Sequence, residues 1–321
     1  MNQSLPTATT SDEKERGAGC AVLPIGSFEQ HGDYLPLITD TVIACAISRE
    51  LARAYLLLQL PPVTISCSHE HSAWRGTVSI SSSTLHSMID DIYRSVTDSG
   101  LTSLVILNCH GGNYVLANIV QEGNVDGKRM ALFPSGRDWA DARQSAGLAT
   151  SNHEDMHAGE LETSILLHVN PELVRDGYQA ADWTADDRRY LLTTGMSEYT
   201  QSGVIGRPSL ASAEKGKALI ASLVDNFASV LGVLQRPLPE PQSACSTLGK
   251  ALQSHGSAPN RENRRHAGPV NPPADPGNER LSGTCGSAGG LRRCPATGVR
   301  QPPAPPGCPP RRGEPARPGL D

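Results

Sequence analysis

Aromatic residues are scarce in this chain, and the shortage is most severe at one end. Only 4% of the 321 residues are Phe, Trp or Tyr, and none of these lies within 237–321. That segment holds 17 of the 25 prolines and has 11 Lys and Arg against 6 Asp and Glu. So few large apolar groups cannot offset the entropy that ordering costs. The composition therefore predicts a folded unit over 20–236 and a disordered Pro/Arg-rich tail over 237–321.

Other absences narrow the class of protein. Residues 1–19 are polar and lack the apolar core of a secretory signal, so a disordered N-terminus is expected. No apolar run approaches the length of a membrane helix, which predicts no membrane partner. The eight cysteines form no Cys-x-x-Cys pair, and four fall in the folded unit beside mostly apolar residues. They indicate free thiols in a cytoplasmic protein.

The charge balance and the missing nucleotide motifs exclude further functions. Residues 1–236 contain 17 Lys and Arg against 27 Asp and Glu, a net charge of −10. An acidic folded unit argues against a nucleic-acid partner. The chain also lacks a Gly-x-Gly-x-x-Gly fingerprint and a Walker lysine, so phosphate binding is not favoured.

Short apolar runs alternate with segments that have helical periodicity, which predicts an α/β fold with a largely parallel sheet. In such sheets, binding sites lie beyond the carboxyl ends of the strands. The expected strands are 20–25, 104–107 and 130–133, with a further apolar run at 55–60. The expected helices are 40–54, 83–99, a segment ending near 121, 158–169 and 210–234.

The stretch 26–40 follows the first expected strand and concentrates groups that bind metals. Glu29 and His31 are two residues apart, which places both side chains on one face of an extended segment. Asp40 stands at the start of the next helix. Carboxylates together with an imidazole suit Zn²⁺, Mn²⁺ or Fe²⁺ rather than Ca²⁺. The alternative is that Glu29 caps a turn, His31 is a surface residue and Asp40 is a helix cap.

Two later segments offer further candidates. His110 follows a buried strand and precedes Gly111-Gly112, a good position for a ligand. Glu162 lies in the first turns of an expected helix, where the helix dipole favours a carboxylate. Ordinary acidity at a helix start is the alternative for Glu162, and it is the preferred interpretation for Glu160.

A competing motif lies just before that helix. His153-Glu154-Asp155-Met156-His157 matches His-Glu-x-x-His, the signature of zincin proteases. That motif works only on a helix, where its two histidines lie one turn apart. The cap-like residues 149–152 and the weak apolar face here argue against a helix, so a zincin-like protease remains only an alternative hypothesis.

Four residues are candidates for contact with a substrate. Three belong to the polar, non-periodic segment 66–77, which is expected to be a loop, and one is an isolated tryptophan further along. An ordinary polar surface loop is the alternative for the first three. The four residues are His69, Glu70, Trp74 and Trp139, and His71 and Arg75 belong to the same polar cluster as the first three.

Taken together, the motifs resemble the creatininase (creatinine amidohydrolase) family. The matching segments occur in the family's order: Gly26-Ser27-x-Glu29-Gln30-His31-Gly32, Thr39-Asp40-Thr41, Gly76-Thr77-Val78-Ser79, Asn108-x-His110-Gly111-Gly112-Asn113 and His157-Ala158-Gly159. The resemblance implies a three-layer α/β/α sandwich, a homo-oligomer that is usually a hexamer, and two divalent metal ions, with Zn²⁺ favoured over Mn²⁺ or Fe²⁺. It implies Glu29, His31, Asp40, His110 and Glu162 as ligands, with Asp40 bridging, and His157 as the proton shuttle.

One position departs from creatininase proper. That enzyme has a metal-binding Glu where this chain has Gly112. The Gly-Gly form is similar to the mycofactocin-pathway peptidase and the formamidopyrimidine deformylases of the same family. The resemblance therefore implies a metal-dependent amidohydrolase acting on a small-molecule, non-peptide or cyclic amide. A mycofactocin-type peptidase or a formamide deformylase is the alternative within the family, and a catalytically inactive metal-binding scaffold is the alternative of another class.

Overall fold

The computed structural model describes residues 5–236, so the tail predicted over 237–321 lies outside the described residues. Within them, four strands form one sheet in the order β2-β1-β3-β4, and every strand pair is parallel. The strands are β1 (Cys20–Ile25), β2 (Leu58–Gln59), β3 (Ser103–Asn108) and β4 (Met130–Phe133).

The two central strands bury side chains on both faces of the sheet. Val22 of β1 and Val105 of β3 belong to one hydrophobic core, whereas Leu23 and Ile106, the next residues along each strand, belong to the other. Because successive side chains alternate across a strand, a continuous apolar run supplies both cores. This arrangement explains why β1 and β3 consist almost entirely of apolar residues.

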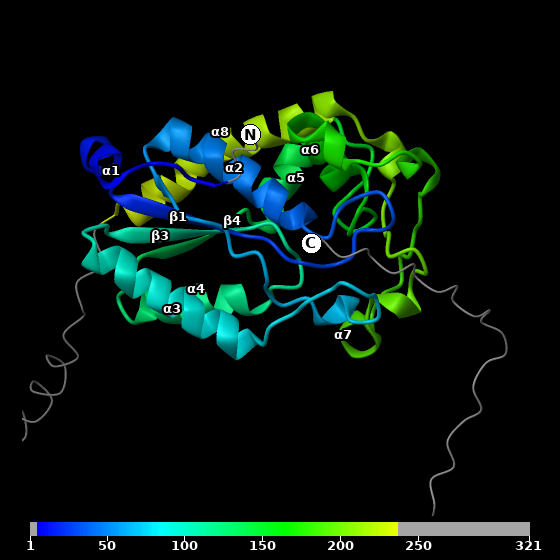
Figure 1. Ribbon diagram of the computed structural model, residues 1–321, viewed down its shortest axis with the longest axis horizontal. Coiled ribbons are helices and arrows are strands. Elements are labelled where there is room, and N and C mark those ends of the chain that lie inside the picture. The colour runs from blue at the N-terminus through cyan, green and yellow to red at the C-terminus, as the bar shows by residue number, and fades with distance from the viewer. Residues whose placement is uncertain (1–4, 237–321) are drawn as a thin grey trace, which may run out of the picture. The chain divides into compact units, whose positions relative to one another are not determined.

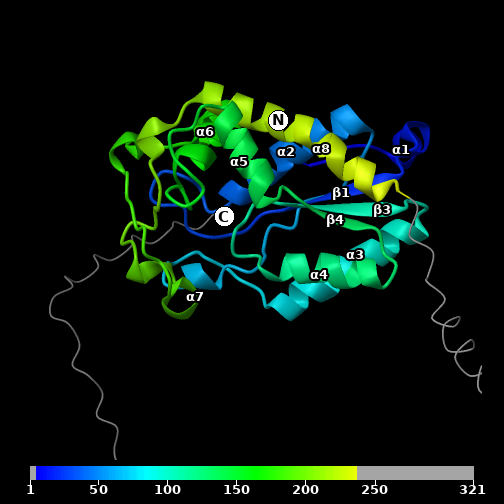
Figure 2. The same cartoon turned by 180° about the vertical axis from the view of Figure 1, so that it is seen from behind.

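Helices cover both faces, as the two opposite views show (Figures 1 and 2). One layer contains α2, α5, α6 and α8, and the other contains α3 and α4. The fold is therefore the predicted three-layer α/β/α sandwich. The helices are α1 (Thr10–Arg16), α2 (Thr39–Tyr55), α3 (Ser82–Asp98), α4 (Val115–Val125), α5 (Gly136–Ser145), α6 (Glu160–Val169), α7 (Leu191–Thr194) and α8 (Ala213–Leu234), with short 3₁₀ turns between some of them.

Two element predictions were too long. The apolar run at 55–60 yields only the two-residue strand β2, because α2 continues to Tyr55 and Leu56 takes a left-handed backbone with φ 52°. Helix α8 begins at Ala213 rather than at Leu210, because Pro208–Leu210 form a 3₁₀ turn and the Ser212 side chain caps the helix. Apolar content alone could not locate these boundaries.

The prediction of a disordered N-terminus is wrong for Thr10–Arg16, which form α1. The Thr9 side chain accepts a hydrogen bond from the Asp12 N–H, and Asp12 accepts one from the Thr9 N–H. This capping box satisfies two donors at the start of the helix. The helix buries no residue, so its apolar pattern gave no signal.

The sequence also did not predict helix α5, because its residues fall in a segment expected to be a long loop before the helix at 158–169. Ser135 and Asp138 form a capping box at its start. Only Ala142 and Arg143 of this helix are buried, which leaves too weak an apolar periodicity to recognise. The spacing Ser-x-x-Asp was the available signal.

Helix α8 is long and apolar enough to cross a membrane, judged by length and composition alone. This finding corrects the prediction that the chain contains no apolar segment of that length. That prediction counted uninterrupted apolar runs, and residues such as Lys217 break the run. In the fold, Leu219, Leu223 and Phe227 are fully buried in the core that α8 shares with α2 and α6. A core helix passes the same test, so length and composition assign no membrane role here.

Candidate metal centre

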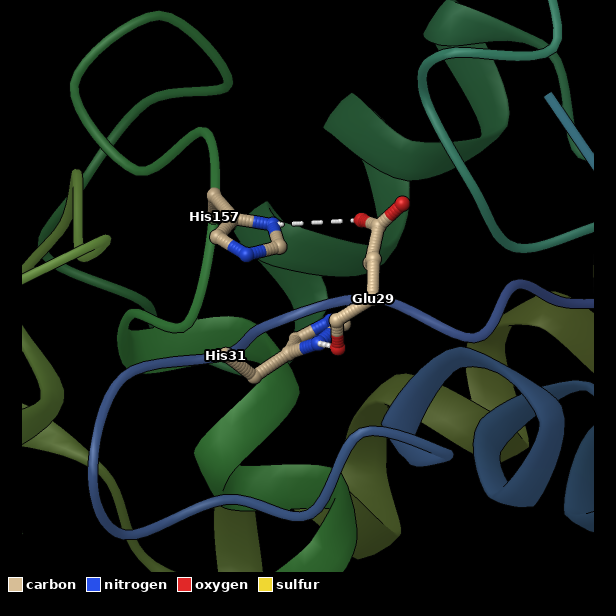
Figure 3. Close-up of side chains that lie close together, drawn as sticks. All are labelled: Glu29, His31 and His157. Carbon is tan, nitrogen blue, oxygen red and sulfur yellow. Dashed lines mark hydrogen bonds and ion pairs between the residues drawn. The ribbon is translucent and has the colours of Figure 1, made fainter. Parts of the chain in front are cut away.

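The candidate ligands meet at the carboxyl edge of the sheet, although they come from four separate segments. Glu29 and His31 lie on the loop after β1, and Asp40 lies in the first turn of α2. His110 follows β3, and Glu162 lies in the first turn of α6. Parallel strands that end at one edge bring these distant segments together. Figure 3 shows Glu29, His31 and the neighbouring His157 around one space.

Close packing holds Asp40 against the loop after β1. A Cβ atom at Gly26 would lie 2.3 Å from the Thr41 backbone nitrogen, so only glycine permits this approach. The Ser27 hydroxyl then donates to Asp40 Oδ2 at 2.8 Å. The loop and the start of α2 therefore form one rigid unit, and the Asp40 carboxylate has a fixed orientation.

Asp40 lies between two groups of potential ligands. His110 Nδ1 is 3.1 Å from Asp40 Oδ2 and 3.2 Å from Glu29 Oε1. On the other side, His31 Nε2 is 3.1 Å from Asp40 Oδ1 and 3.8 Å from Glu162 Oε2. Each set of three offers ligand atoms within 4.8 Å of one another. One carboxylate thus presents a different oxygen to each group, as a bridging ligand does.

Backbone carbonyls orient two of the candidate ligand imidazoles. His31 Nδ1 is 3.0 Å from the Glu29 carbonyl oxygen, and His110 Nε2 is 2.8 Å from the Cys67 carbonyl oxygen. A carbonyl can only accept, so those ring nitrogens carry the protons. The opposite nitrogens face the carboxylates, where each can bind an ion once its proton has left. Outer hydrogen bonds of this kind are typical of metal-binding histidines.

Glu29 provides the test of whether a metal fits. Its side chain is fully buried, and neither carboxylate oxygen has a hydrogen-bond partner among the described residues. A buried, unsatisfied carboxylate is costly unless a cation compensates it. The mixed imidazole and carboxylate donors around it suit Zn²⁺ or a similar divalent ion. The residues present therefore fit a metal centre.

His157 approaches the same carboxylate from the segment before α6. Its Nε2 donates to the Gln30 carbonyl oxygen at 2.6 Å, and its Nδ1 lies 3.8 Å from Glu29 Oε1. Burial lowers the pKa of His157 well below its usual range, and the neighbouring rings of His31 and His71 lower it further. His157 also forms a third possible ligand group with Glu29 and His31. Its neutral Nδ1 is free either to accept a proton or to bind an ion.

The protonation of the metal-free site predicts how metal binding depends on pH. Burial raises the pKa of Glu162 to about 8. Burial lowers the pKa of His31, but the charge of Asp40 outweighs it and raises that pKa to about 9. Burial lowers the pKa of His110 as well, but Glu29 and Asp40 outweigh that effect and raise it well above its usual range. An ion must displace these protons, so metal affinity should rise with pH from neutrality to at least about 9. Calorimetry in buffers of different ionisation enthalpy measures the proton release, and a pH-independent affinity would contradict this prediction.

Two of the four predicted substrate contacts line a cavity beside the ligands. Glu70 lines a cavity of about 600 Å³ together with Glu29, His110 and His157. Trp139 lines a second cavity of about 290 Å³, which also contacts His110, His157 and Glu162. His69 and Trp74 are not among the residues that line these two described cavities.

Two further residues lie near the site, and only the first was a candidate in the sequence, as a member of the polar cluster in segment 66–77. His71 is 2% exposed, and its Nε2 atom lies 3.2 Å from Glu29 Oε1. Arg143 binds Asp155 at 2.9 Å and the Asp155 carbonyl oxygen at 3.0 Å, which braces the loop that carries His157. His71 lines the cavity of about 600 Å³, as the sequence interpretation of that cluster expected. Nothing local marked Arg143, because its partners lie in a loop.

The His-Glu-x-x-His segment is not helical. His153 and Glu154 lie in a turn and are exposed, and His153 Nε2 is bonded to the Asp186 carbonyl oxygen at 2.9 Å. Only His157 of the motif reaches the buried groups. The zincin-like geometry is therefore absent from this part of the described chain.

The exposed position of His153 and the buried position of His31 allow a direct comparison of two variants. His153→Ala should leave the metal content unchanged, because the side chain is exposed and bonded to a loop carbonyl. His31→Ala should remove at least one ion per chain, because it deletes a buried donor shared by two ligand groups. Elemental analysis of both purified proteins makes the comparison. Loss of metal in His153→Ala with retention in His31→Ala would support the protease alternative instead.

Known proteins share both the sequence pattern and the fold. The family model for creatininase (creatinine amidohydrolase) matches residues 6–231. A mycofactocin precursor peptide peptidase from Mycobacterium ulcerans (strain Agy99) is 33% identical over 225 residues, which cover 65% of this chain and 82% of that protein.

Solved structures agree on the architecture. A crystal structure of creatinine amidohydrolase (creatininase) superimposes with a TM-score of 0.61 at 22% identity, covering 72% of this chain and 97% of that one. A mutant creatininase described as Zn-Zn type gives a TM-score of 0.59 at 22% identity, over 72% and 97% of the two chains. At this identity the likeness shows the fold. With the family match over 6–231 and a metal-capable cluster at the sheet edge, the chain belongs to the creatininase family and is a hydrolase of amide C–N bonds.

Proposed function

We propose that this chain is a two-metal hydrolase that cleaves an amide bond in a peptide-derived substrate. The observation that carries the proposal is the position of Asp40, whose two oxygens face separate ligand groups. Glu29 and His110 would hold one ion with Asp40, and His31 and Glu162 would hold the other with it. The donor set favours Zn²⁺, with Mn²⁺ or Fe²⁺ as alternatives.

The bound ions would supply an activated water and polarise the amide carbonyl. The chain's own part is to place a proton carrier beside them. His157 Nδ1 carries a lone pair, because Nε2 donates to the Gln30 carbonyl oxygen. We assign to His157 the acceptance of a proton at Nδ1 and its delivery to the leaving nitrogen. Its depressed pKa keeps the ring neutral and able to accept.

Gly112 supports a reaction other than creatinine hydrolysis. A Cβ atom at Gly112 would lie 2.0 Å from Glu70 Oε1 and 2.5 Å from His110 Nε2, so a side chain here would displace these neighbours. Glu162 instead supplies a carboxylate near His31. This arrangement departs from creatininase proper at a ligand position, and it argues for a different substrate.

The size of the larger cavity and the relatives favour a peptide-derived amide. About 600 Å³ is within the range that ligands much larger than a single small ring occupy. The exposed Tyr114 lines this cavity and offers an aromatic surface to an apolar side chain. The relative at 33% identity is named as a precursor peptide peptidase. The peptidase hypothesis is therefore preferred over the small cyclic amide.

A small cyclic or formyl amide is the second candidate. The cavity of about 290 Å³ supports it, because Trp139 lines that cavity and reaches the same side chains, His157 and Glu162. An indole face can stack on a planar ring. The two candidates thus use different cavities around one metal centre.

The test is hydrolysis by the Zn²⁺-loaded and Mn²⁺-loaded protein of a panel that contains short peptides, formamides and creatinine. We expect turnover of peptides that falls to background after chelation and returns when metal is added. Trp139→Ala should affect peptide turnover little but should impair creatinine turnover if the second candidate is correct. A fully loaded protein that hydrolyses no member of the panel would support an inactive scaffold.

A further inference from the structure

A fourth imidazole, His71, lies in the centre but outside the ligand groups. It is 2% exposed, belongs to the 3₁₀ turn His69–His71, and lines the cavity of about 600 Å³. Its Nε2 is 3.2 Å from Glu29 Oε1. None of the three metal-capable groups found among the described residues includes it. Its role therefore has to be argued separately from metal binding.

Gln30 fixes which nitrogen of His71 carries the proton. The Gln30 Oε1 atom accepts from the Gly32 N–H at 2.9 Å, and Nε2 donates to the Gly203 carbonyl oxygen at 3.1 Å. A flipped amide would place oxygen against that carbonyl and NH₂ against that N–H, so this orientation is determined by its partners. The same Gln30 Nε2 lies 2.9 Å from His71 Nδ1. His71 Nδ1 must therefore accept, which leaves the proton on Nε2.

The packing around Gln30 shows that this amide is held tightly. A Cβ atom at Gly203 would lie 1.7 Å from Gln30 Oε1, and the backbone there has φ +87°, which favours glycine. Gln30 itself is 5% exposed. The amide therefore has little freedom to rotate, and the tautomer of His71 is set by the fold.

His71 thus differs from the three neighbouring histidines in the ring nitrogen that faces the centre. His31, His110 and His157 each donate to a backbone carbonyl from one ring nitrogen and turn the other nitrogen, the one that an ion would bind, toward the carboxylates. His71 presents an N–H group. That N–H forms no hydrogen bond with Glu29, since Glu29 Oε1 has no hydrogen-bond partner in the described structure. A metal ion does not bind a protonated ring nitrogen, whereas a substrate oxygen does accept from one.

We propose that His71 donates a hydrogen bond from Nε2–H to the carbonyl oxygen of the substrate amide, held in this tautomer by Gln30. The proposal rests on the proposed amide hydrolysis. When water adds to the carbonyl carbon, the C=O π electrons move to the oxygen, which gains negative charge. The proton stays on His71 throughout, and the fixed N–H stabilises that charge without rearrangement.

The kinetic test uses His71→Ala and His71→Asn, which retains a donor. His71→Ala should lower kcat about 10²-fold, with little change in KM and unaltered metal content. His71→Asn should recover part of the loss. His86→Ala, an exposed imidazole on α3, is the control and should behave as the unchanged protein. Loss of metal in His71→Ala would show that His71 is a ligand, and an unchanged kcat would exclude a donor role.

A second measurement tests the tautomer without any activity. Long-range ¹⁵N–¹H spectra of the metal-free full chain should show the His71 proton on Nε2. Gln30→Met removes the amide at similar size and should let the Nδ1–H form appear. An Nδ1–H tautomer in the unchanged protein would overturn the inference. If no amide is hydrolysed at all, the proposed function and the donor role both fail, while the spectra still decide the tautomer.

Discussion

Asp40→Asn is expected to have the largest effect of any single substitution, because it weakens both metal sites at once. The side chain is 1% exposed, and each carboxylate oxygen faces one ligand group. Burial raises the pKa of Asp40, but the charges of His31 and His110 outweigh this effect and hold the pKa well below its usual range. The carboxyl group is therefore ionised. An amide oxygen binds divalent ions far less well than a carboxylate. Metal content should fall below one ion per chain, and amide hydrolysis should fall at least about 10³-fold.

Asp33→Asn is the matched control, since Asp33 lies on the same loop but is exposed. It should leave the metal content and the turnover as they are. If Asp40→Asn kept two ions and most of its activity, the carboxylate would not be the shared ligand. In that case the third possible ligand group, Glu29, His31 and His157, would be the better description of the centre.

Glu162→Gln should have the second largest effect, because in the proposed centre Glu162 would replace the ligand that Gly112 cannot provide. Its Oε2 lies 3.8 Å from His31 Nε2 and accepts from the Ala158 N–H at 2.6 Å, so the backbone orients it toward the second group. We expect the ion near His31 to be lost while the ion near His110 is retained. Elemental analysis should therefore give about one ion per chain.

Glu160→Gln provides a sharp contrast two residues away. Glu160 accepts from Lys215 Nζ at 2.6 Å and from the Thr150 hydroxyl at 2.7 Å, so it ties α6 to α8 and to the loop before it. Its substitution should lower the free energy of unfolding by about 1–3 kcal/mol and leave both ions in place. Chemical denaturation and elemental analysis separate the two glutamates. Equal loss of metal in both variants would contradict the assignment of Glu162.

The sequence was sufficient to predict the fold and the clustering of the candidate ligands for identifiable reasons. Strands such as β3 are buried on both faces, so they appear as continuous apolar runs, and the carboxyl edge of a parallel sheet is a known location for sites. Glu29, His31 and Asp40 are close in sequence, so their cluster was visible in one stretch. The pairing of that stretch with His110 and Glu162 came from family motifs, and the fold brings these residues together.

Features that depend on distant contacts escaped prediction. The role of Gln30 requires Gly203, which is 173 residues away, and no local pattern indicates such a contact. Arg143 lies on a helix with little apolar face, and its partners belong to the following loop. The distinction between Glu160 and Glu162 depends on which side of α6 faces Lys215 and which faces His31. These are properties of packing, which sequence spacing alone does not specify.

The central claim is that one carboxylate joins two metal sites. The most direct test is an anomalous difference map at the zinc absorption edge from crystals of the Zn²⁺-loaded protein. The account predicts two peaks on opposite sides of Asp40, one beside Glu29 and His110 and the other beside His31 and Glu162. A single peak, or peaks located at His153, would contradict it.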